Sequence, residues 1–308
     1  MKHPYRKSAL LMALIAAVSL GISSFTYRPQ KRNDTVTVTA AFYPMYTAAL
    51  QIVGDADGVT VQCLTAPTSG CLHDYQLSPS EMLTLTNTDI LLLNGAGAES
   101  FLTAALSSLP HLVCIDSSVG IDLKHAESDG HHHDHHHESE TLNSHLWTSP
   151  SLYAQQIKTL RDGLCNADPA HAAIYTENAN AYLKKIDALI QRANAVSLTD
   201  TAILFHDSAV YFADSCHLTV GAVLPAETES GLSAAQLTEA ASAITDKRAL
   251  FICDDQYPVH TDLLSPYAAS FSVLSLDTAV TPKDGVADAE RWLQAMNHNL
   301  TQLEVLTP

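Results

Sequence analysis

From Asp34 onward, short apolar runs along the chain alternate with longer amphipathic stretches. Runs of four to six apolar residues have the length of buried strands, and apolar residues every three or four positions are typical of helices. In the first half the pattern predicts strands at residues 36–41, 59–63, 90–93 and 112–115, a helix at 44–53, and another beginning at Ser78–Pro79. This alternation predicts an α/β protein.

The second half repeats the arrangement. We predict strands at residues 202–205, 249–252 and 272–275, with helices between them and a final helix at about 286–302. Residues 151–197 are mostly helical, and Asp168 and Pro169 have the character of a cap and a first turn. A helix from there to about residue 195 would span roughly 40 Å, a length suited to a rigid connection between two lobes.

We therefore expect an α/β fold with two lobes, each with a parallel-type sheet flanked by helices, joined by one long rigid helix. The expected divisions are a signal peptide or N-terminal anchor, an N-terminal lobe, the linking helix and a C-terminal lobe, at residues 1–33, 34–167, 168–197 and 198–308.

The balance of charged residues indicates which kinds of molecule the protein can bind. The 308 residues contain 16 Lys and Arg against 33 Asp and Glu, a formal net charge of −17. Six of those cations lie within residues 1–33, which contain no acid, so the rest of the chain is more acidic still. Such a surface repels phosphate backbones and attracts cations, so we expect no nucleic-acid partner.

The N-terminus has the features of an export signal. Basic Lys2, Arg6 and Lys7 precede the apolar run 9–18, and small residues follow near Ser23. Cleavage near Ser23 and an uncleaved membrane anchor both remain open, and no cysteine follows the run to make a lipobox. We expect the remainder to lie outside the membrane, in the periplasm or at the outer face of the cell.

Six cysteines suit an oxidising compartment and allow 15 pairings. The pair that we favour is Cys63–Cys71, which flanks a short turn; the pairing of Cys114, Cys165, Cys216 and Cys253 stays open.

A histidine-rich insert occupies residues 125–137. A segment of this composition cannot bury enough apolar surface to become ordered, so we expect a mobile loop. Its clustered imidazoles would bind metal weakly and at several sites. The histidines of this auxiliary loop are His125, His131, His132, His133, His135, His136 and His137.

Three further histidines have a common setting, near the end of an apolar strand or in the loop after it: His73, His145 and His206. Asp254 and Asp255 follow the strand at 249–252 in the same way. Ligands of open α/β sheets bind outside the carboxyl ends of strands, so these groups could converge. Three imidazoles and a carboxylate form a tetrahedral set suited to Zn²⁺.

Several motifs resemble those of the zinc/manganese solute-binding proteins of ABC importers, the cluster A-I family. They follow in order along nearly the whole chain: His73-Asp74-Tyr75-Gln76-Leu77-Ser78-Pro79-Ser80-Glu81, Asn94-Gly95-Ala96-Gly97-Ala98-Glu99, His145-Leu146-Trp147, His206-Asp207-Ser208-Ala209-Val210-Tyr211 and Asp254-Asp255-Gln256-Tyr257. Gln76 stands where family members usually have Glu, and Asn143 replaces a common Asp.

The resemblance implies two lobes bridged by a long helix, one metal ion between them, and delivery of that ion to an ABC-transporter membrane permease. We expect the protein to be a monomer. It implies ligand roles for His73, His145, His206 and Asp254, with Asp255 as the alternative fourth ligand. The histidine-rich insert favours Zn²⁺ over Mn²⁺.

Other functions on this scaffold stay open. They are a manganese-specific binding protein, a surface adhesin and a metallohydrolase. We expect no enzyme activity, because the sequence has no His-Glu-x-x-His or Gly-x-Ser-x-Gly signature and four protein ligands close a zinc site to water.

Overall fold

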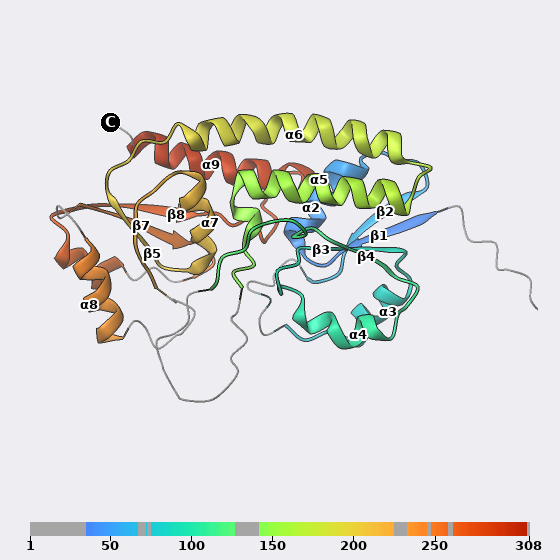
Figure 1. Ribbon diagram of the computed structural model, residues 1–308, viewed down its shortest axis with the longest axis horizontal. Coiled ribbons are helices and arrows are strands. Elements are labelled where there is room, and N and C mark those ends of the chain that lie inside the picture. Colours follow the sequence, from blue (N-terminus) through green and yellow to red (C-terminus); the bar gives the residue numbers. More distant parts are fainter. Residues whose placement is uncertain are drawn as a thin grey trace, which may run out of the picture. The chain divides into compact units, whose positions relative to one another are not determined.

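Two four-stranded parallel sheets, each covered by helices, form the frame of the structure (Figure 1). This computed structural model describes residues 35–66, 72, 75–126, 142–224, 233–244, 248–257 and 261–306. From Val36 onward the chain forms a single contact unit. The two sheets with their flanking helices confirm the expected fold class. The domain boundaries stay a prediction.

The first sheet has the strand order β2-β1-β3-β4. Its strands are β1 (Val36–Ala40), β2 (Val59–Cys63), β3 (Ile90–Leu93) and β4 (Val113–Asp116). The helical segments of this half are α2 (Tyr43–Val53), α3 (Pro79–Thr86), η1 (Ser100–Leu102) and α4 (Thr103–Ser107). Helix α3 begins where predicted, and a capping box closes its start, because Ser78 and Glu81 each bond the other's backbone N–H.

The second sheet has the order β6-β5-β7-β8, again with parallel pairing. Its strands are β5 (Thr201–Leu204), β6 (Val220–Val223), β7 (Arg248–Asp254) and β8 (Ser270–Leu276). The helical segments of this half are η3 (Asp207–Ala209), α7 (Val210–Ser215), α8 (Ala234–Ala243), η4 (Thr261–Leu263), η5 (Ser265–Tyr267), η6 (Asp288–Glu290) and α9 (Arg291–Leu306).

Strand β6 was not predicted from the sequence, because Gly221 interrupts a short run and glycine is unfavourable in strands. The structure gives the reason for this glycine: a Cβ there would come within 2.5 Å of Thr201 Cγ2 on β5. The final helix also begins at Arg291, five residues later than predicted.

Between the halves lie η2 (Leu146–Thr148), α5 (Pro150–Ala167) and α6 (Ala172–Asn194). The prediction that Pro169 opens the long helix was wrong. Asp168 instead ends α5, and its Oδ2 bonds the ring of His171 at 2.7 Å and the hydroxyl of Tyr175 at 2.8 Å. These bonds turn the chain before α6 begins at Ala172.

Helix α6 packs against α2 of the first half and against α9 of the second, as well as along α5 (Figure 1). Its buried positions follow helical spacing and include Tyr175, Tyr182, Ile186 and Leu189. Because α6 contacts a helix of each half, it corresponds to the long helix that we expected to join the two lobes.

The two tryptophans lie in the core. The Trp292 ring stacks on Tyr153 with centroids 3.9 Å apart. The Trp292 indole N–H donates to Trp147 O, and the Trp147 indole N–H donates to Thr278 O, each over 2.8 Å. These bonds satisfy the polar ends of the buried rings and fix the segment around Trp147 against the second half.

Cys63, Cys114, Cys165, Cys216 and Cys253 carry free thiols. Cys71, the partner predicted for Cys63, lies outside the described residues, so the structure does not show the bridge that we expected between them. In the described ranges, no helix combines the length and the apolar character that crossing a membrane requires.

Candidate metal centre

The centre of the second sheet is a topological switch point. Strand β5 lies between β6 and β7, so the connections from neighbouring strands β5 and β7 leave in opposite directions and open a crevice at their carboxyl ends. His206 follows β5 after a single residue, and Asp254 is the last residue of β7. The pairing of Leu204 with Ile252 places these two side chains at the same edge of the sheet.

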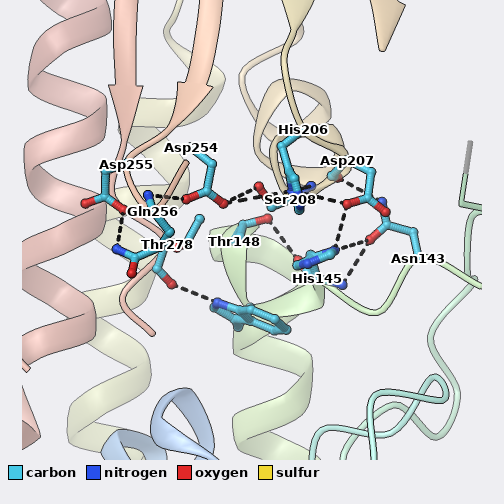
Figure 2. A network of polar contacts seen from close by, with 11 residues as sticks. Asn143, His145, Thr148, His206, Asp207, Ser208, Asp254, Asp255, Gln256 and Thr278 are labelled. Atoms are coloured by element: carbon cyan, nitrogen blue, oxygen red, sulfur yellow. Dashed lines mark hydrogen bonds and ion pairs between the residues drawn. The ribbon is translucent and has the colours of Figure 1, made fainter. Parts of the chain in front are cut away.

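Asp254 is a buried carboxylate, with 5% of its surface exposed. Its Oδ2 accepts from the Ser208 hydroxyl at 2.7 Å, and its Oδ1 accepts from Gln256 N at 2.9 Å. Burial raises the pKa of Asp254, and these two hydrogen bonds and nearby His206 act in the opposite direction. The neighbouring Asp255 is exposed and accepts from the Gln256 side chain, away from the histidines (Figure 2).

His206 is almost fully buried, at 2% exposure. Its Nδ1 accepts from Ser208 N at 3.0 Å, so the imidazole caps η3. The same Nδ1 lies 3.3 Å from Asp207 Oδ1 and 3.9 Å from Asp254 Oδ2. On its face the ring stacks on Tyr257, with centroids 4.5 Å apart and planes 16° from parallel. The orientation of this ring is therefore fixed on several sides.

His145 lies in the turn before α5, where it is the cap residue of η2. The first sheet holds this turn through Asn94, which follows β3 directly. Asn94 Nδ2 donates to Ser144 O at 2.9 Å, and Asn94 Oδ1 accepts from Gln156 Nε2 at 2.9 Å. The first sheet thus positions His145 indirectly, through the hydrogen bonds of Asn94. His206, in contrast, lies just past the end of β5 in the second sheet.

Glu99 closes the loop that carries Asn94. Its two carboxylate oxygens accept from Asn94 N at 2.7 Å and from Gly95 N at 3.1 Å. Gly95 has a φ of +80°, and a Cβ there would come within 1.8 Å of Asp116 Oδ1, so only glycine fits. Burial raises the pKa of Glu99 to about 7 despite the two N–H donors.

His145 and His206 converge from the two halves, with ring centroids 5.5 Å apart and planes at 83°. Asp207 Oδ1 lies 3.4 Å from His145 Nδ1 and so contacts both rings (Figure 2). In the part of the chain that the structure describes, His145, His206 and Asp207 each offer one ligand atom, and these atoms lie within 4.8 Å of one another. Imidazole nitrogens with carboxylate oxygens are donors that suit Zn²⁺ and related divalent ions.

Sequence reasoning did not single out Asp207 as a site residue. The indication was present, because Asp207 directly follows His206 within the motif that carries the resemblance. What the sequence could not show is that its carboxylate contacts the rings of both histidines.

A cavity of about 30 Å³ opens beside the histidines. Its polar lining includes His145, His206 and Asp254, whereas Phe42 and Leu72 contribute apolar walls. Asp207 is absent from the lining described for this cavity. The volume exceeds the minimum for one water molecule, so a small ion would also fit among these groups.

His73 and the histidines at 131–137 lie outside the described residues; His125 is described and exposed, and pairs with Leu142 in an isolated antiparallel bridge. Cys253 packs in a buried apolar cluster of the second sheet, and burial raises its pKa to about 12. It is therefore a core residue of the second sheet.

Comparison with known proteins gives a consistent result. The family model described as zinc-uptake complex component A, periplasmic (ZnuA), matches residues 38–305. The high-affinity zinc uptake system protein ZnuA of Bacillus subtilis (strain 168) is 30% identical over 182 residues, which are 58% of this chain and 56% of that protein. The iron-binding protein YfeA of Yersinia pestis is 29% identical over 191 residues, 60% of this chain and 57% of that protein. The chain therefore spans a little over half the length of these curated relatives.

Solved structures show the same fold at lower sequence identity. A zinc-bound deletion mutant of ZnuA matches with a TM-score of 0.67 and 22% identity, over 88% of this chain and 96% of that chain. The protein FpvC of Pseudomonas aeruginosa in complex with Ni²⁺ matches with a TM-score of 0.68 and 21% identity, over 89% and 98%. These likenesses concern the fold.

Proposed function

The chain belongs to the ZnuA family, and on that premise we propose that it is the extracytoplasmic metal-capture protein of an ABC importer. It binds one Zn²⁺ ion between its two halves and delivers the ion to the membrane permease. The relatives are named for zinc and iron uptake, which supports a transition-metal cargo in general. Export by the N-terminal segment and action as a monomer are parts of the same proposal.

One observation carries the proposal: two buried imidazoles from different halves of the chain meet edge to face beside a small cavity with a buried carboxylate. His145 and His206 provide the nitrogen donors, and Asp254 provides the oxygen donor. Taking such polar groups out of water is costly unless they are paired or bind an ion. A bound divalent cation would add to the hydrogen bonds that Ser208 already gives to Asp254 and His206.

His73 is the proposed fourth ligand. It follows Leu72 directly, and Leu72 forms part of the wall of the same cavity. Asp254 is preferred to Asp255 because Asp254 lines this cavity and Asp255 is exposed. Three imidazoles and one carboxylate would complete a tetrahedral zinc site without an open position for water, and such a site holds its ion and does no hydrolysis.

The preference for Zn²⁺ over Mn²⁺ rests on ligand chemistry. Imidazole nitrogen favours zinc, whereas manganese is better matched by oxygen donors. The histidine-rich insert would add weak sites that raise the local zinc concentration.

The test is elemental analysis of protein purified without added metal, followed by competition between Zn²⁺ and Mn²⁺ for the stripped protein. We expect one tightly bound zinc per chain and displacement of Mn²⁺ by equimolar Zn²⁺. Preferential retention of manganese would assign the chain to the manganese-binding members. Failure to bind either ion would contradict the proposal.

A further inference from the structure

Asn143 is a buried amide behind His145, at 1% exposure. Its side-chain oxygen accepts two hydrogen bonds from His145, one from the backbone N–H and one from ring Nδ1, each over 3.0 Å. Its side-chain nitrogen donates to Asp207 O over 2.9 Å. One side chain thus contacts both segments that carry the buried histidines (Figure 2).

These contacts determine the orientation of the amide and the tautomer of the ring. The group that faces Asp207 O must be the NH₂, because a carbonyl oxygen can accept only from a donor. The amide oxygen therefore faces His145, and this oxygen can only accept. The hydrogen of neutral His145 then resides on Nδ1, and the lone pair that can bind a metal ion is on Nε2.

The backbone of Asn143 is held as firmly as its side chain. Its N–H donates to Lys124 O at 2.9 Å, and its carbonyl accepts from the Tyr211 hydroxyl at 3.0 Å. The Tyr211 hydroxyl also accepts from Lys124 N at 2.9 Å. Asn143 consequently cannot rotate to offer a different atom to His145 without breaking several buried hydrogen bonds.

We infer that Asn143 is a positioning residue of the metal site, which fixes the tautomer of His145 and ties this ligand to the loop that carries His206. The inference rests on the proposed function. Metal-binding histidines generally donate their second ring N–H to an oxygen acceptor that orients the ring, and loss of such an acceptor weakens metal affinity about 10–100-fold. An amide supplies this acceptor here and adds a donor to the opposite half, which a carboxylate could not do.

The experiment combines zinc affinity with the tautomer of His145. Zinc affinity is measured by competition with a chromophoric chelator. The tautomer is read from ¹⁵N chemical shifts of metal-free, histidine-labelled protein about two pH units above the usual histidine pKa of about 6.5. The His145 signals are identified by their loss in His145→Gln. In the wild type we expect the hydrogen on Nδ1.

Asn143→Ala removes the nearer acceptor at His145 Nδ1 and leaves Asp207 Oδ1 at 3.4 Å. We therefore expect His145 to move part of the way toward the Nε2–H tautomer and zinc affinity to fall about 10–100-fold. Asn143→Asp keeps an acceptor at Nδ1 but loses the donor to Asp207 O, so the tautomer should be retained and the affinity should recover in part. Asn143→Ser, which is smaller and still polar, takes the place of Asn143→Ala where that variant does not fold.

Asn194→Ala is the matched control, because Asn194 makes the same kind of amide–imidazole contact, with His217 at 3.1 Å, but at an exposed position outside the cavity. Its zinc affinity should equal that of the wild type. An unchanged His145 tautomer and unchanged affinity in both Asn143→Ala and Asn143→Ser would overturn the inference. Absence of zinc binding by the wild type would instead contradict the proposed function, and the tautomer comparison would still test the role of Asn143.

Discussion

The Ser208 hydroxyl donates to Asp254 Oδ2 over 2.7 Å, and this bond joins the loop after β5 to the end of β7. Ser208 also donates its backbone N–H to His206 Nδ1 at 3.0 Å. A single residue therefore fixes the carboxylate and the imidazole that the second sheet contributes to the cavity. Because Asp254 is held in this way and Asp255 is not, exchanging the roles of the two carboxylates would require the end of β7 to rearrange.

We predict that Asp254→Asn lowers zinc affinity at least about a hundredfold, or roughly 3 kcal/mol, because removing a ligand should cost no less than removing an outer partner of a ligand. Asp255→Asn is the matched control, since it makes the same chemical change at the adjacent, exposed carboxylate. Isothermal calorimetry or chelator competition measures both. If Asp255→Asn has the larger effect, the assignment of Asp254 as the carboxylate ligand is wrong.

His206→Ala should abolish tight binding while the protein stays folded. The metal-free variant loses the bond that caps η3, a change that costs about 1–2 kcal/mol of stability, and also the stacking on Tyr257. Zinc at a hundredfold excess over its dissociation constant should add ~2.7 kcal/mol to the unfolding free energy of the wild type. Thermal unfolding with and without Zn²⁺ measures this, and an equal zinc-dependent shift in His206→Ala would remove His206 from the site.

Deletion of residues 125–137 should remove weak metal binding and leave the tight site intact. The hydrogen bonds from Ser208 to His206 and Asp254, and from Asn94 to the turn that carries His145, come from residues outside 125–137. A titration of the stripped variant with Zn²⁺ should show one tight equivalent, with fewer weak equivalents than the wild type. Loss of the tight equivalent would show that the insert takes part in the main site.

The sequence indicates the positions of the two proposed ligands of the second half, His206 and Asp254, more directly than that of His145. His206 and Asp254 stand at or near the ends of neighbouring strands, so an apolar run followed by polar residues indicates both positions, although it left Asp255 as an alternative to Asp254. His145 was expected in the same kind of position, but in the structure it caps η2 shortly before α5 and does not directly follow a described strand. Its position depends on Asn94, which reaches Ser144 across 50 residues of sequence, and on Asn143. Long-range hydrogen bonds of this kind leave no periodic pattern in a single sequence.

The errors in the predicted elements have equally local causes. Asp168 and Pro169 fit the beginning of a helix, but the same aspartate can end a helix by accepting side-chain hydrogen bonds, as it does from Tyr175. Gly221 made β6 look like a loop, although the close approach of Thr201 requires a glycine within that strand. In both cases local propensity allows two structures, and a contact with another residue, Tyr175 or Thr201, determines which of them forms.

Glu99 gives a prediction for the pH dependence of stability. Its pKa is raised from 4.5 to about 7, because burial disfavours the carboxylate. The native state therefore binds more protons than the unfolded state between these two values, and the stability that the protonated group contributes is lost as the pH rises through this range. At about 1.4 kcal/mol per pH unit, the loss is at most roughly 3 kcal/mol.

Glu99→Gln cannot ionise, so the difference in unfolding free energy between wild type and variant should shift in favour of the variant as the pH rises from about 5 to 8. Urea unfolding in the presence of a chelator measures it, because stripping the metal removes proton release by the ligands from the comparison. Glu239→Gln, on the exposed face of α8, should show no such trend. A pH-independent difference for Glu99→Gln would mean that Glu99 ionises in the native state near its ordinary pKa, held by Asn94 N and Gly95 N. The loop that supports His145 would then be equally stable on both sides of neutrality.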